Sequence, residues 1–393
     1  MIVPRCVYRE IEDMRILIAA DMVPTTSNIS LFREGKLNDL VGEELVRVFK
    51  NVDFRIANLE APLVDICSPI HKCGPNLMAP TDTVKAYREL QIDLLTIANN
   101  HIMDQGFEGL RSSCTVLDGA GIAHVGAGDS LQDALKPFIF EMNGKNIGVY
   151  ACTEHEFSTA SENHPGANPF DPYESFDHVA RLKEKCDCII VLYHGGKEYY
   201  RYPSPNLQKI CRKFVEKGAN VVLCQHSHCI GCKEEYRNGV IVYGQGNFLF
   251  ARREDEFWNN GMLIEVEINN SVRVDYIPVV KYHEKVRIAS EKEKEEIMSA
   301  FYRRSQQILE KNFIATNYDE FADSLYQHYF DIMSGNKYGL ISYKLLSKFG
   351  KKKVDSFLQR KLYQEESILA LINTIECEAH REVLLCGLKH RIK

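Results

Sequence analysis

Short, continuously apolar segments recur between Arg15 and Pro278, and they constrain the fold more than any other feature of the sequence. Most are apolar at every position rather than at every second position, which is typical of strands buried on both faces of a sheet. Segments with helical periodicity separate these runs, and this alternation predicts a layered α/β architecture. The predicted strands are residues 16–20, 54–59, 93–98, 146–152, 188–193, 220–224, 240–243 and 262–268.

The pattern changes near residue 287. Beyond this point the sequence is helical and charge-rich, and it contains no further strand of comparable quality. We therefore predict an α/β domain over residues 1–287 and a helical appendage over residues 288–393. Apolar residues recur at helical spacing in the appendage, so we expect it to pack in a core or against a partner helix and to support a homo-oligomer. The predicted helices of the domain are residues 40–50, 81–90, 107–119, 174–185 and 207–217, with Gly119 and Gly218 as C-caps.

Composition excludes several classes of protein. The net charge is −6 and the pI is about 6.1, so there is no overall basic field to attract nucleic acid. The 13 cysteines are odd in number and unevenly spaced, as expected of reduced thiols rather than a disulfide framework. No segment approaches the ~20 apolar residues of a membrane span, and the first residues lack the apolar core of a signal peptide. We expect a soluble, cytoplasmic protein without an integral membrane segment.

Polar residues follow the predicted strands at the points where the strands end. In open α/β sheets, ligands bind beyond the carboxyl ends of the strands, so side chains from five such ends can converge. Two histidines, two residues apart on an extended chain, are expected to point the same way. Each residue alone has a simpler explanation, as a helix cap, a turn former or a core histidine. The coincidence at five strand ends favours a metal site, made by Asp21, Glu60, Asn100 with His101, His194, and His226 with His228.

The residue types narrow the choice of metal. Imidazole together with carboxylate and amide oxygen suits Zn, Mn, Fe or Co better than Ca. The set is larger than a single tetrahedral zinc requires. Two ions ~3.5–4 Å apart, bridged by a carboxylate, would activate a water molecule and polarise the scissile bond. We expect one or two divalent transition metal ions, Mn, Fe or Zn.

The motifs, taken together, resemble the CapA family of poly-γ-glutamate capsule biosynthesis proteins, which is related to the calcineurin-like metallophosphoesterases. The resemblance covers about residues 15–250 and does not reach the helical appendage. It implies a metallophosphoesterase-like sandwich. The matching motifs are residues 58–62 (NLEAP), 99–101 (NNH) with Asp104 and Gly106, 126–128 (GAG), 194–199 (HGGKEY), 225–228 (QHSH) and 243–248 (YGQGNF).

The resemblance also implies a role for each site residue. Asp21 and His228 would bind the first metal, and Glu60 would bridge the two metals. Asn100, His194 and His226 would bind the second metal. His101 would protonate the leaving group or steady the transition state, and Asp104 would orient His101.

The sequence departs from the phosphoesterase pattern in two places. Val23 stands where an Asp-x-His motif has its histidine, and the Gly-Asp-x-x-Asp element is absent, so Glu60 must replace its aspartate. The resemblance therefore implies that the first metal has fewer protein ligands. Family members often carry an N-terminal membrane anchor; this chain shows none, so a direct role in polymer export is less expected.

Further polar residues adjoin the predicted site. Glu154 and His155 follow the strand at 146–152, and Lys197 and Glu198 follow His194. We expect these four residues to contact an anionic substrate, either a small molecule or a polymer. A solvent-exposed ion pair is the simpler alternative for Lys197 and Glu198.

Two functions remain open from the sequence. The first is a metal-dependent hydrolase that acts on a phosphoester or a γ-glutamyl-type amide in capsule or cell-surface polymer metabolism. The second is a non-catalytic scaffold that binds the polymer or a synthase partner, which the missing histidine of Asp-x-His favours. Retention of Asn100, His101, His226 and His228 argues against a pure scaffold, because a scaffold does not need buried imidazoles at strand ends.

Overall fold

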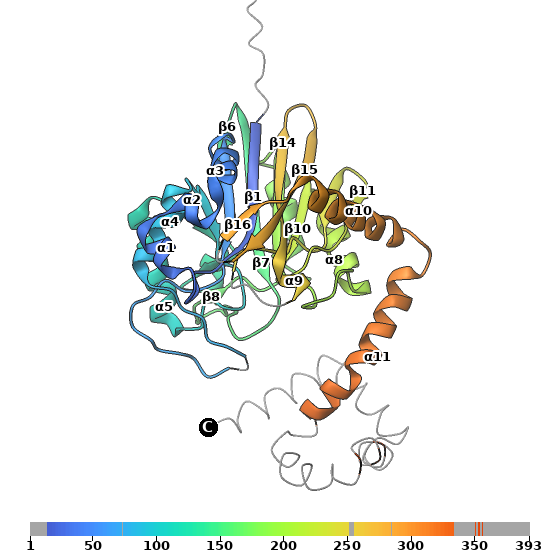
Figure 1. Ribbon diagram of the computed structural model, residues 1–393. Coiled ribbons are helices and arrows are strands. Elements are labelled where there is room, and N and C mark those ends of the chain that lie inside the picture. Colours follow the sequence, from blue (N-terminus) through green and yellow to red (C-terminus); the bar gives the residue numbers. More distant parts are fainter. Residues whose placement is uncertain are drawn as a thin grey trace, which may run out of the picture. The chain divides into compact units, whose positions relative to one another are not determined.

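The computed structural model describes residues 14–72, 74–250, 255–283 and 285–333, together with residues 350, 353 and 356 (Figure 1). The chain divides into two compact units, Met1–Tyr318 and Asp319–Lys393. All of the predicted strands and all of the predicted site residues belong to the first unit.

Two mixed sheets form the centre of the first unit. Strands β1 to β4 pair in parallel within the first sheet, and β7, β9, β10 and β12 pair in parallel within the second. The first sheet has the order β16 (Lys285–Ile288), β15 (Val272–Tyr282), β14 (Asn260–Ile268), β1 (Met14–Met22), β2 (Phe54–Leu59), β3 (Leu94–Thr96) and β4 (Ala123–Val125), and β13 (Asn247–Leu249) also pairs with β1. The second has the order β11 (Lys233–Tyr236), β12 (Gly239–Val242), β10 (Val221–Gln225), β9 (Cys188–His194), β7 (Lys145–Thr153) and β6 (Phe138–Met142).

Apolar side chains between the sheets and outside them create four layers. Ile16, Ile56, Ile190 and Leu223, from strands of both sheets, belong to one buried cluster between the sheets. A second cluster joins the first sheet to helices α1 (Ile29–Glu34), α2 (Leu37–Leu40), α3 (Gly42–Lys50), α4 (Val84–Glu89) and α5 (Gly106–Ala120). A third joins the second sheet to α7 (Ser175–Lys183) and α8 (Pro205–Glu216). Figure 1 shows α1 to α5 on one side of the sheets and α8 on the other. The predicted layered α/β sandwich is confirmed.

Every predicted strand and helix of the domain is present, but one predicted cap is wrong. Gly119 lies inside α5, which continues to Ala120 and is capped by Gly121 in the left-handed conformation, with a φ of 71°. Gly218 directly follows Lys217, the C-cap residue of α8, and has a φ of 118°. The remaining short elements are η1 (Thr81–Thr83), β5 (Ala127–Gly128), α6 (Leu131–Ala134), β8 (Gly166–Ala167) and α9 (Glu256–Asn259).

Helix α10 (Glu291–Gln307) packs against the strands of the first unit, although the sequence assigns it to the appendage. Ser290 and Glu293 form a capping box at its N-terminus. Phe301 is fully buried in the cluster between the sheets. Arg304 is also buried and donates to the carbonyl oxygens of Gly231 (2.7 Å) and Ile230 (3.0 Å). The compact unit thus includes α10, while the predicted boundary at residue 287 stays a prediction.

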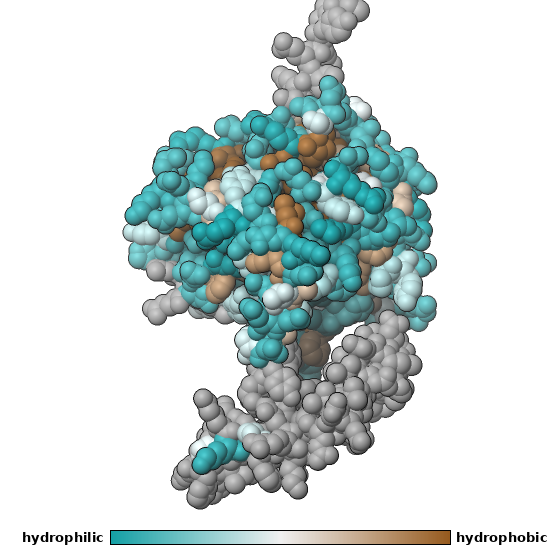
Figure 2. Space-filling model, turned by 90° about the vertical axis from the view of Figure 1, so that its right-hand side faces the viewer, coloured by the Kyte–Doolittle hydropathy of each residue, from teal (hydrophilic) through white to brown (hydrophobic). Residues whose placement is uncertain are grey.

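Helix α11 (Phe313–Met333) follows, and most of the predicted appendage beyond it lies outside the described residues. The homo-oligomer expected from that segment therefore stays a prediction. Among the residues that the structure describes, none of the helices is both long and apolar enough to span a membrane. The face drawn in Figure 2 is largely hydrophilic, with hydrophobic side chains in a few small patches.

Candidate metal centre

Parallel pairing brings the ends of the central strands to one place. Asp21, near the end of β1, is paired with Asn58 on β2 and with Asn247 on β13. His194 ends β9 and is paired with Gln225, the last residue of β10. Glu60 and His226 come directly after β2 and β10. The predicted convergence of these strand ends is therefore present in the structure.

The backbone at His226 and His228 is not extended. This corrects the prediction that both side chains point the same way from an extended chain. His226 and His228 both have positive φ angles, 85° and 56°. Such angles cost a non-glycine residue about 1–3 kcal/mol, so the surrounding structure must hold them. As a result the two imidazoles serve different parts of the site.

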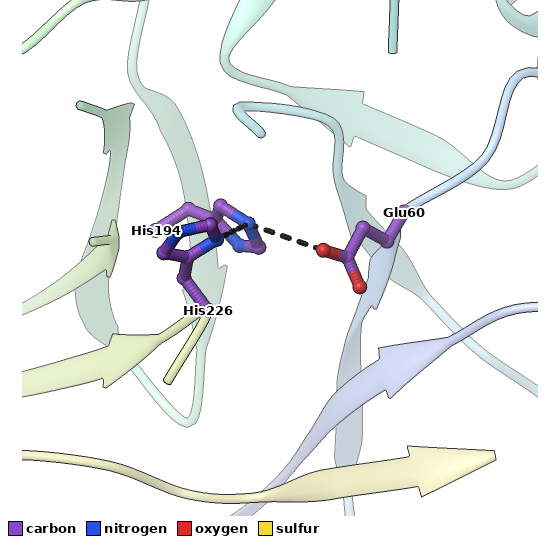
Figure 3. A group of neighbouring side chains, drawn as sticks. All are labelled: Glu60, His194 and His226. Carbon is purple, nitrogen blue, oxygen red and sulfur yellow. Dashed lines mark hydrogen bonds and ion pairs between the residues drawn. The ribbon is translucent and has the colours of Figure 1, made fainter. Parts of the chain in front are cut away.

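Four side chains form what we call the histidine cluster: Glu60, Asn100, His194 and His226. His194 Nε2 lies 3.3 Å from Glu60 Oε1, 3.1 Å from Asn100 Oδ1 and 3.2 Å from His226 Nδ1. Figure 3 shows Glu60, His194 and His226 pointing toward one another from the ends of separate strands. Donor atoms that share one metal ion at bond lengths of about 2.1 Å lie roughly 3.0–3.4 Å apart. The observed separations match that spacing.

Asp21 and His228 form a second group, which we call the aspartate cluster. His228 Nδ1 lies 3.8 Å from Asp21 Oδ2 and 2.9 Å from Asn247 Oδ1. Asn58 Nδ2 donates to Asp21 Oδ1 at 2.7 Å. Single ligand atoms of Asp21, Glu60 and His228 all lie within 4.8 Å of one another, so Glu60 adjoins both clusters.

The burial of these groups tests whether a cation fits. Glu60 is fully buried and neither of its carboxylate oxygens has a hydrogen-bond partner; Asp21 Oδ2 is likewise buried without one. Burial raises the pKa of Asp21 to about 7, with a further rise from Glu60, and burial also raises the pKa of Glu60 to about 7. An uncompensated buried charge is costly, and a bound cation offsets that cost. The residues present therefore fit a divalent metal.

His226 and His228 are suited to bind a metal as neutral ligands, because their imidazoles do not take up a proton near pH 7. Burial lowers the pKa of His228 to about 3 and lowers the pKa of His226 well below its ordinary value. Both imidazoles therefore stay neutral near pH 7, and a neutral imidazole offers a lone pair. In the histidine cluster a single ring proton cannot satisfy three neighbouring acceptors, whereas a cation can.

His101 and Asp104 lie beside the histidine cluster, together with a lysine that the sequence prediction missed. His101 Nδ1 is 2.6 Å from Asp104 Oδ2. Lys72 pairs with the other oxygen of Asp104 and lies 3.2 Å from His101 Nδ1, with 2% of its side chain exposed. Lys72 comes from the loop after β2, which has no periodic pattern, so only the folded chain shows its place.

Asn58 is another site residue that the sequence prediction left without a role. Its amide nitrogen donates to Asp21 and lies 3.4 Å from His194 Nδ1, and its oxygen accepts from Thr96 (2.9 Å) and Asn99 (3.1 Å). Asn58 thus ties β1, β2 and β3 together beneath both clusters. Its place two residues before Glu60, on a buried strand, was the available signal.

The four residues expected to bind substrate have different surroundings. Glu154 Oε1 accepts from the backbone of Gly196 at 2.9 Å, so this carboxylate holds the turn after His194. Glu198 Oε1 lies 3.8 Å from His228 Nε2, beside the aspartate cluster. His155 and Lys197 are exposed to solvent.

Two further residues, Glu156 and Val23, bear on the ligands that the site can offer. Glu156 lies at its edge, 3.6 Å from His226 Nε2 and within hydrogen-bonding distance of Asn100. Val23, which replaces the histidine of Asp-x-His, is buried and offers no ligand atom. The aspartate cluster accordingly lacks the imidazole that the resemblance would place there.

The part of the chain that carries both clusters is similar to known proteins. A family profile described as "Bacterial capsule synthesis protein PGA_cap" matches residues 16–252. The capsule biosynthesis protein CapA of Bacillus anthracis is 27% identical over 255 residues, which are 61% of this chain and 61% of that protein. The PGA biosynthesis protein CapA of Bacillus subtilis is 27% identical over 260 residues, 63% of this chain and 66% of that protein. The chain thus matches less than two thirds of the length of either relative.

Solved structures show a weaker likeness. A phosphatase from Mycoplasma pneumoniae has a TM-score of 0.45 at 12% identity and covers 72% of this chain and 96% of its own. A 5'-nucleotidase precursor from Thermus thermophilus has a TM-score of 0.38 at 14% identity, covering 76% of this chain and 59% of its own. Both TM-scores are below 0.5, so neither likeness assigns a role to any residue.

Proposed function

Because the chain belongs to the bacterial capsule synthesis protein family PGA_cap, we propose that it is a metal-dependent hydrolase in capsule or cell-surface polymer metabolism. Its substrate is an anionic small molecule or polymer with a phosphoester or a γ-glutamyl-type amide. The observation that carries this proposal is the buried convergence of Glu60, Asn100, His194 and His226, in which both Glu60 oxygens lack hydrogen-bond partners.

The two clusters would hold the metal. Glu60, Asn100, His194 and His226 supply the donors for one ion, and Asp21, Glu60 and His228 supply donors for another. Mn, Fe and Zn suit this mixture of imidazole, carboxylate and amide oxygen. When bound, such ions polarise a phosphoryl or carbonyl oxygen and lower the pKa of water.

His101 is the residue that we propose as the general acid. Its Nδ1 is held by Asp104, so Nε2 is the ring nitrogen left to exchange a proton with a leaving group. Lys72 compensates the charge of Asp104, which also accepts from the backbone of Leu77 at 2.6 Å. These contacts fix the tautomer and the direction of the imidazole before substrate binds.

Metal analysis followed by an activity screen tests the proposal. The protein, purified without chelator and loaded with Mn²⁺, Fe²⁺ or Zn²⁺, is assayed on p-nitrophenyl phosphate, bis(p-nitrophenyl) phosphate and γ-glutamyl-p-nitroanilide. We expect His101→Ala to lower the rate about 10²–10⁴-fold while the metal content stays unchanged. His124→Ala, at a histidine of β4 whose Nε2 lies 3.3 Å from Asp118 Oδ1, is the matched control. A metal-loaded wild type that cleaves none of these substrates would count against hydrolysis.

The second candidate function is a non-catalytic scaffold for the polymer or a synthase partner. The buried Val23, in place of a histidine, is the observation that favours it. A scaffold would bind a poly-γ-glutamate chain equally well before and after His101→Ala. The same pair of proteins therefore separates the two functions.

A further inference from the structure

The imidazole of His228 has a second ring nitrogen, Nε2, besides the Nδ1 that lies 3.8 Å from Asp21 Oδ2. Because His228 Nδ1 lies 2.9 Å from Asn247 Oδ1, an acceptor, Nδ1 carries the ring proton. The lone pair is therefore on Nε2. The carboxylate that faces Nε2 is that of Glu198, with Oε1 at 3.8 Å, and this is the one ion pair of Glu198 among the described residues.

The backbone after His194 brings Glu198 back over the histidine turn. Gly196 has a φ of 107° and Tyr199 has a φ of 60°, so the chain reverses on both sides of Glu198. The amide of Tyr199 donates to the carbonyl of Ser227 at 2.9 Å, which ties this loop to the residue between the two histidines. The placement of Glu198 beside His228 is therefore set by the backbone and does not depend on the flexible side chain alone.

The surroundings of Glu198 already contain unpartnered ligand atoms. Asp21 Oδ2 and both oxygens of Glu60 are fully buried without hydrogen-bond partners. Glu198, with 39% of its side chain exposed, adds a third carboxylate beside His228, and a bound cation would offset the repulsion among the three.

We infer that Glu198 is a metal ligand that completes the aspartate cluster in place of the histidine missing at Val23. With Asp21, Glu60 and His228 it gives four protein donors, three carboxylates and one imidazole. The atom of His228 that would bind the ion is Nε2, which lies 3.8 Å from Glu198 Oε1, and single ligand atoms of Asp21, Glu60 and His228 lie within 4.8 Å of one another. The 3.8 Å separation exceeds the roughly 3.0–3.4 Å of donors on one ion, so the partly exposed Glu198 side chain would move inward when the ion binds. This inference rests on the metal binding that the proposed function requires, but not on hydrolysis.

The two clusters would then prefer different ions. The histidine cluster offers two imidazoles, an amide oxygen and one carboxylate, a set that suits zinc or iron. The completed aspartate cluster is richer in carboxylate oxygen, which Mn²⁺ accepts more readily. We therefore expect zinc to favour the histidine cluster over the aspartate cluster by more than Mn²⁺ does, so that Mn²⁺ is the ion suited to fill both.

Glu156 provides a matched control for Glu198. It faces His226 Nε2 at 3.6 Å, as Glu198 faces His228 at 3.8 Å, and the exposed fractions of the two side chains are 37% and 39%. Glu156 adjoins the histidine cluster, which already has four donors without it. If removal of any negative charge beside the clusters weakens metal binding, Glu156→Gln and Glu198→Gln will both weaken it. If Glu198 is a ligand of the aspartate cluster, only Glu198→Gln will remove one metal equivalent.

The experiment is Mn²⁺ binding by the full-length protein, measured by equilibrium dialysis with elemental analysis and by electron paramagnetic resonance of the bound ion. Wild type and Glu156→Gln are expected to bind two equivalents. Glu198→Gln is expected to keep the tighter equivalent and to lose the weaker one, or to bind it at least tenfold more weakly. Circular dichroism and the melting temperature confirm that each variant is folded.

Three outcomes would overturn the inference. The first is two unchanged equivalents in Glu198→Gln, the second is an equal loss in both variants, and the third is a wild type that takes up fewer than two ions at saturating Mn²⁺. A wild type that binds two ions but cleaves no substrate leaves this inference standing and refutes the proposed hydrolysis instead. The two proposals can therefore fail separately.

Discussion

The histidine cluster and the aspartate cluster share Glu60 but differ in how completely their donors are assembled. In the histidine cluster three donor atoms lie 3.1–3.3 Å from His194 Nε2. In the aspartate cluster the Asp21–His228 separation is 3.8 Å, and amides occupy Asp21 Oδ1 and His228 Nδ1. A compact set of donors loses little entropy on binding an ion, so the first cluster should bind more tightly. Two neighbouring sites built on the same strand ends can thus have unequal affinity.

The largest effect is expected from His194→Ala, which removes the nitrogen that contacts every other donor of the histidine cluster. We expect loss of the tighter metal equivalent and a fall of hydrolysis to background, measured by elemental analysis and by turnover. His164→Ala, at an exposed histidine, is the control. Retention of both metal equivalents in His194→Ala would contradict the expectation that the histidine cluster binds metal more tightly than the aspartate cluster.

A smaller effect is expected from His228→Ala, which removes the imidazole of the aspartate cluster. The weaker equivalent should disappear while the tighter one stays within about threefold of its wild-type affinity, because His228 gives no donor to the histidine cluster. Calorimetric titration with Mn²⁺ measures both steps. Equal weakening of the two steps would show that the clusters act as one unit.

The pH dependence should also distinguish the clusters. The pKa of Asp21 and of Glu60 is raised to about 7, so below pH 7 protons compete with metal, by about tenfold for each displaced proton and each pH unit. The aspartate cluster contains both carboxylates, whereas the histidine cluster shares only Glu60. Metal affinity should therefore fall more steeply at the weaker site between pH 8 and pH 6, as titrations at both values would show.

The same pKa shifts determine how the stability of the metal-free protein changes with pH. A carboxyl whose folded pKa is raised stabilises the fold below its ordinary pKa, and that stability is lost as the pH rises through about 7. His228, with its pKa lowered to about 3, has the opposite effect, because stability is lost as the pH falls below about 6.5. Added metal should therefore raise the melting temperature more at pH 8 than at pH 6.

The smallest effect is expected from Arg304→Ala. The substitution leaves the carbonyl oxygens of Ile230 and Gly231 without their donor, at a cost of about 1–3 kcal/mol in unfolding free energy. His228 lies closer along the chain to these carbonyls than His226 does, so the weaker metal equivalent should lose more affinity, about tenfold. Arg303→Ala, at the exposed neighbour, should change neither quantity in thermal melts or Mn²⁺ titrations.

Much of the fold could be predicted because its central strands are buried on both faces. β2, β9 and β10 are almost wholly buried, so their sequences are apolar nearly throughout. β6 and β15 are partly exposed edge or near-edge strands with mixed sequences, and β13 has only three residues; these gave no comparable signal.

The site could be predicted as far as chain order determines it. Asp21, Glu60 and His194 stand at the ends of apolar strands, where parallel pairing brings them together. The positive φ angles of His226 and His228, and the contact of Lys72 with Asp104, depend on tertiary packing between segments far apart in sequence. No local pattern in the sequence encodes those features.

Arg304 has a consequence for the order in which the protein is made. The family match ends at residue 252, yet Ile230 and Gly231, which closely follow His228 in the chain, accept hydrogen bonds from Arg304 of a helix that begins at Glu291. On a ribosome, both histidines emerge well before that helix is synthesised, and domains fold as their segments become available. We expect metal to be captured late in biogenesis, and a fragment that stops at residue 252 to bind it more weakly than the whole chain does.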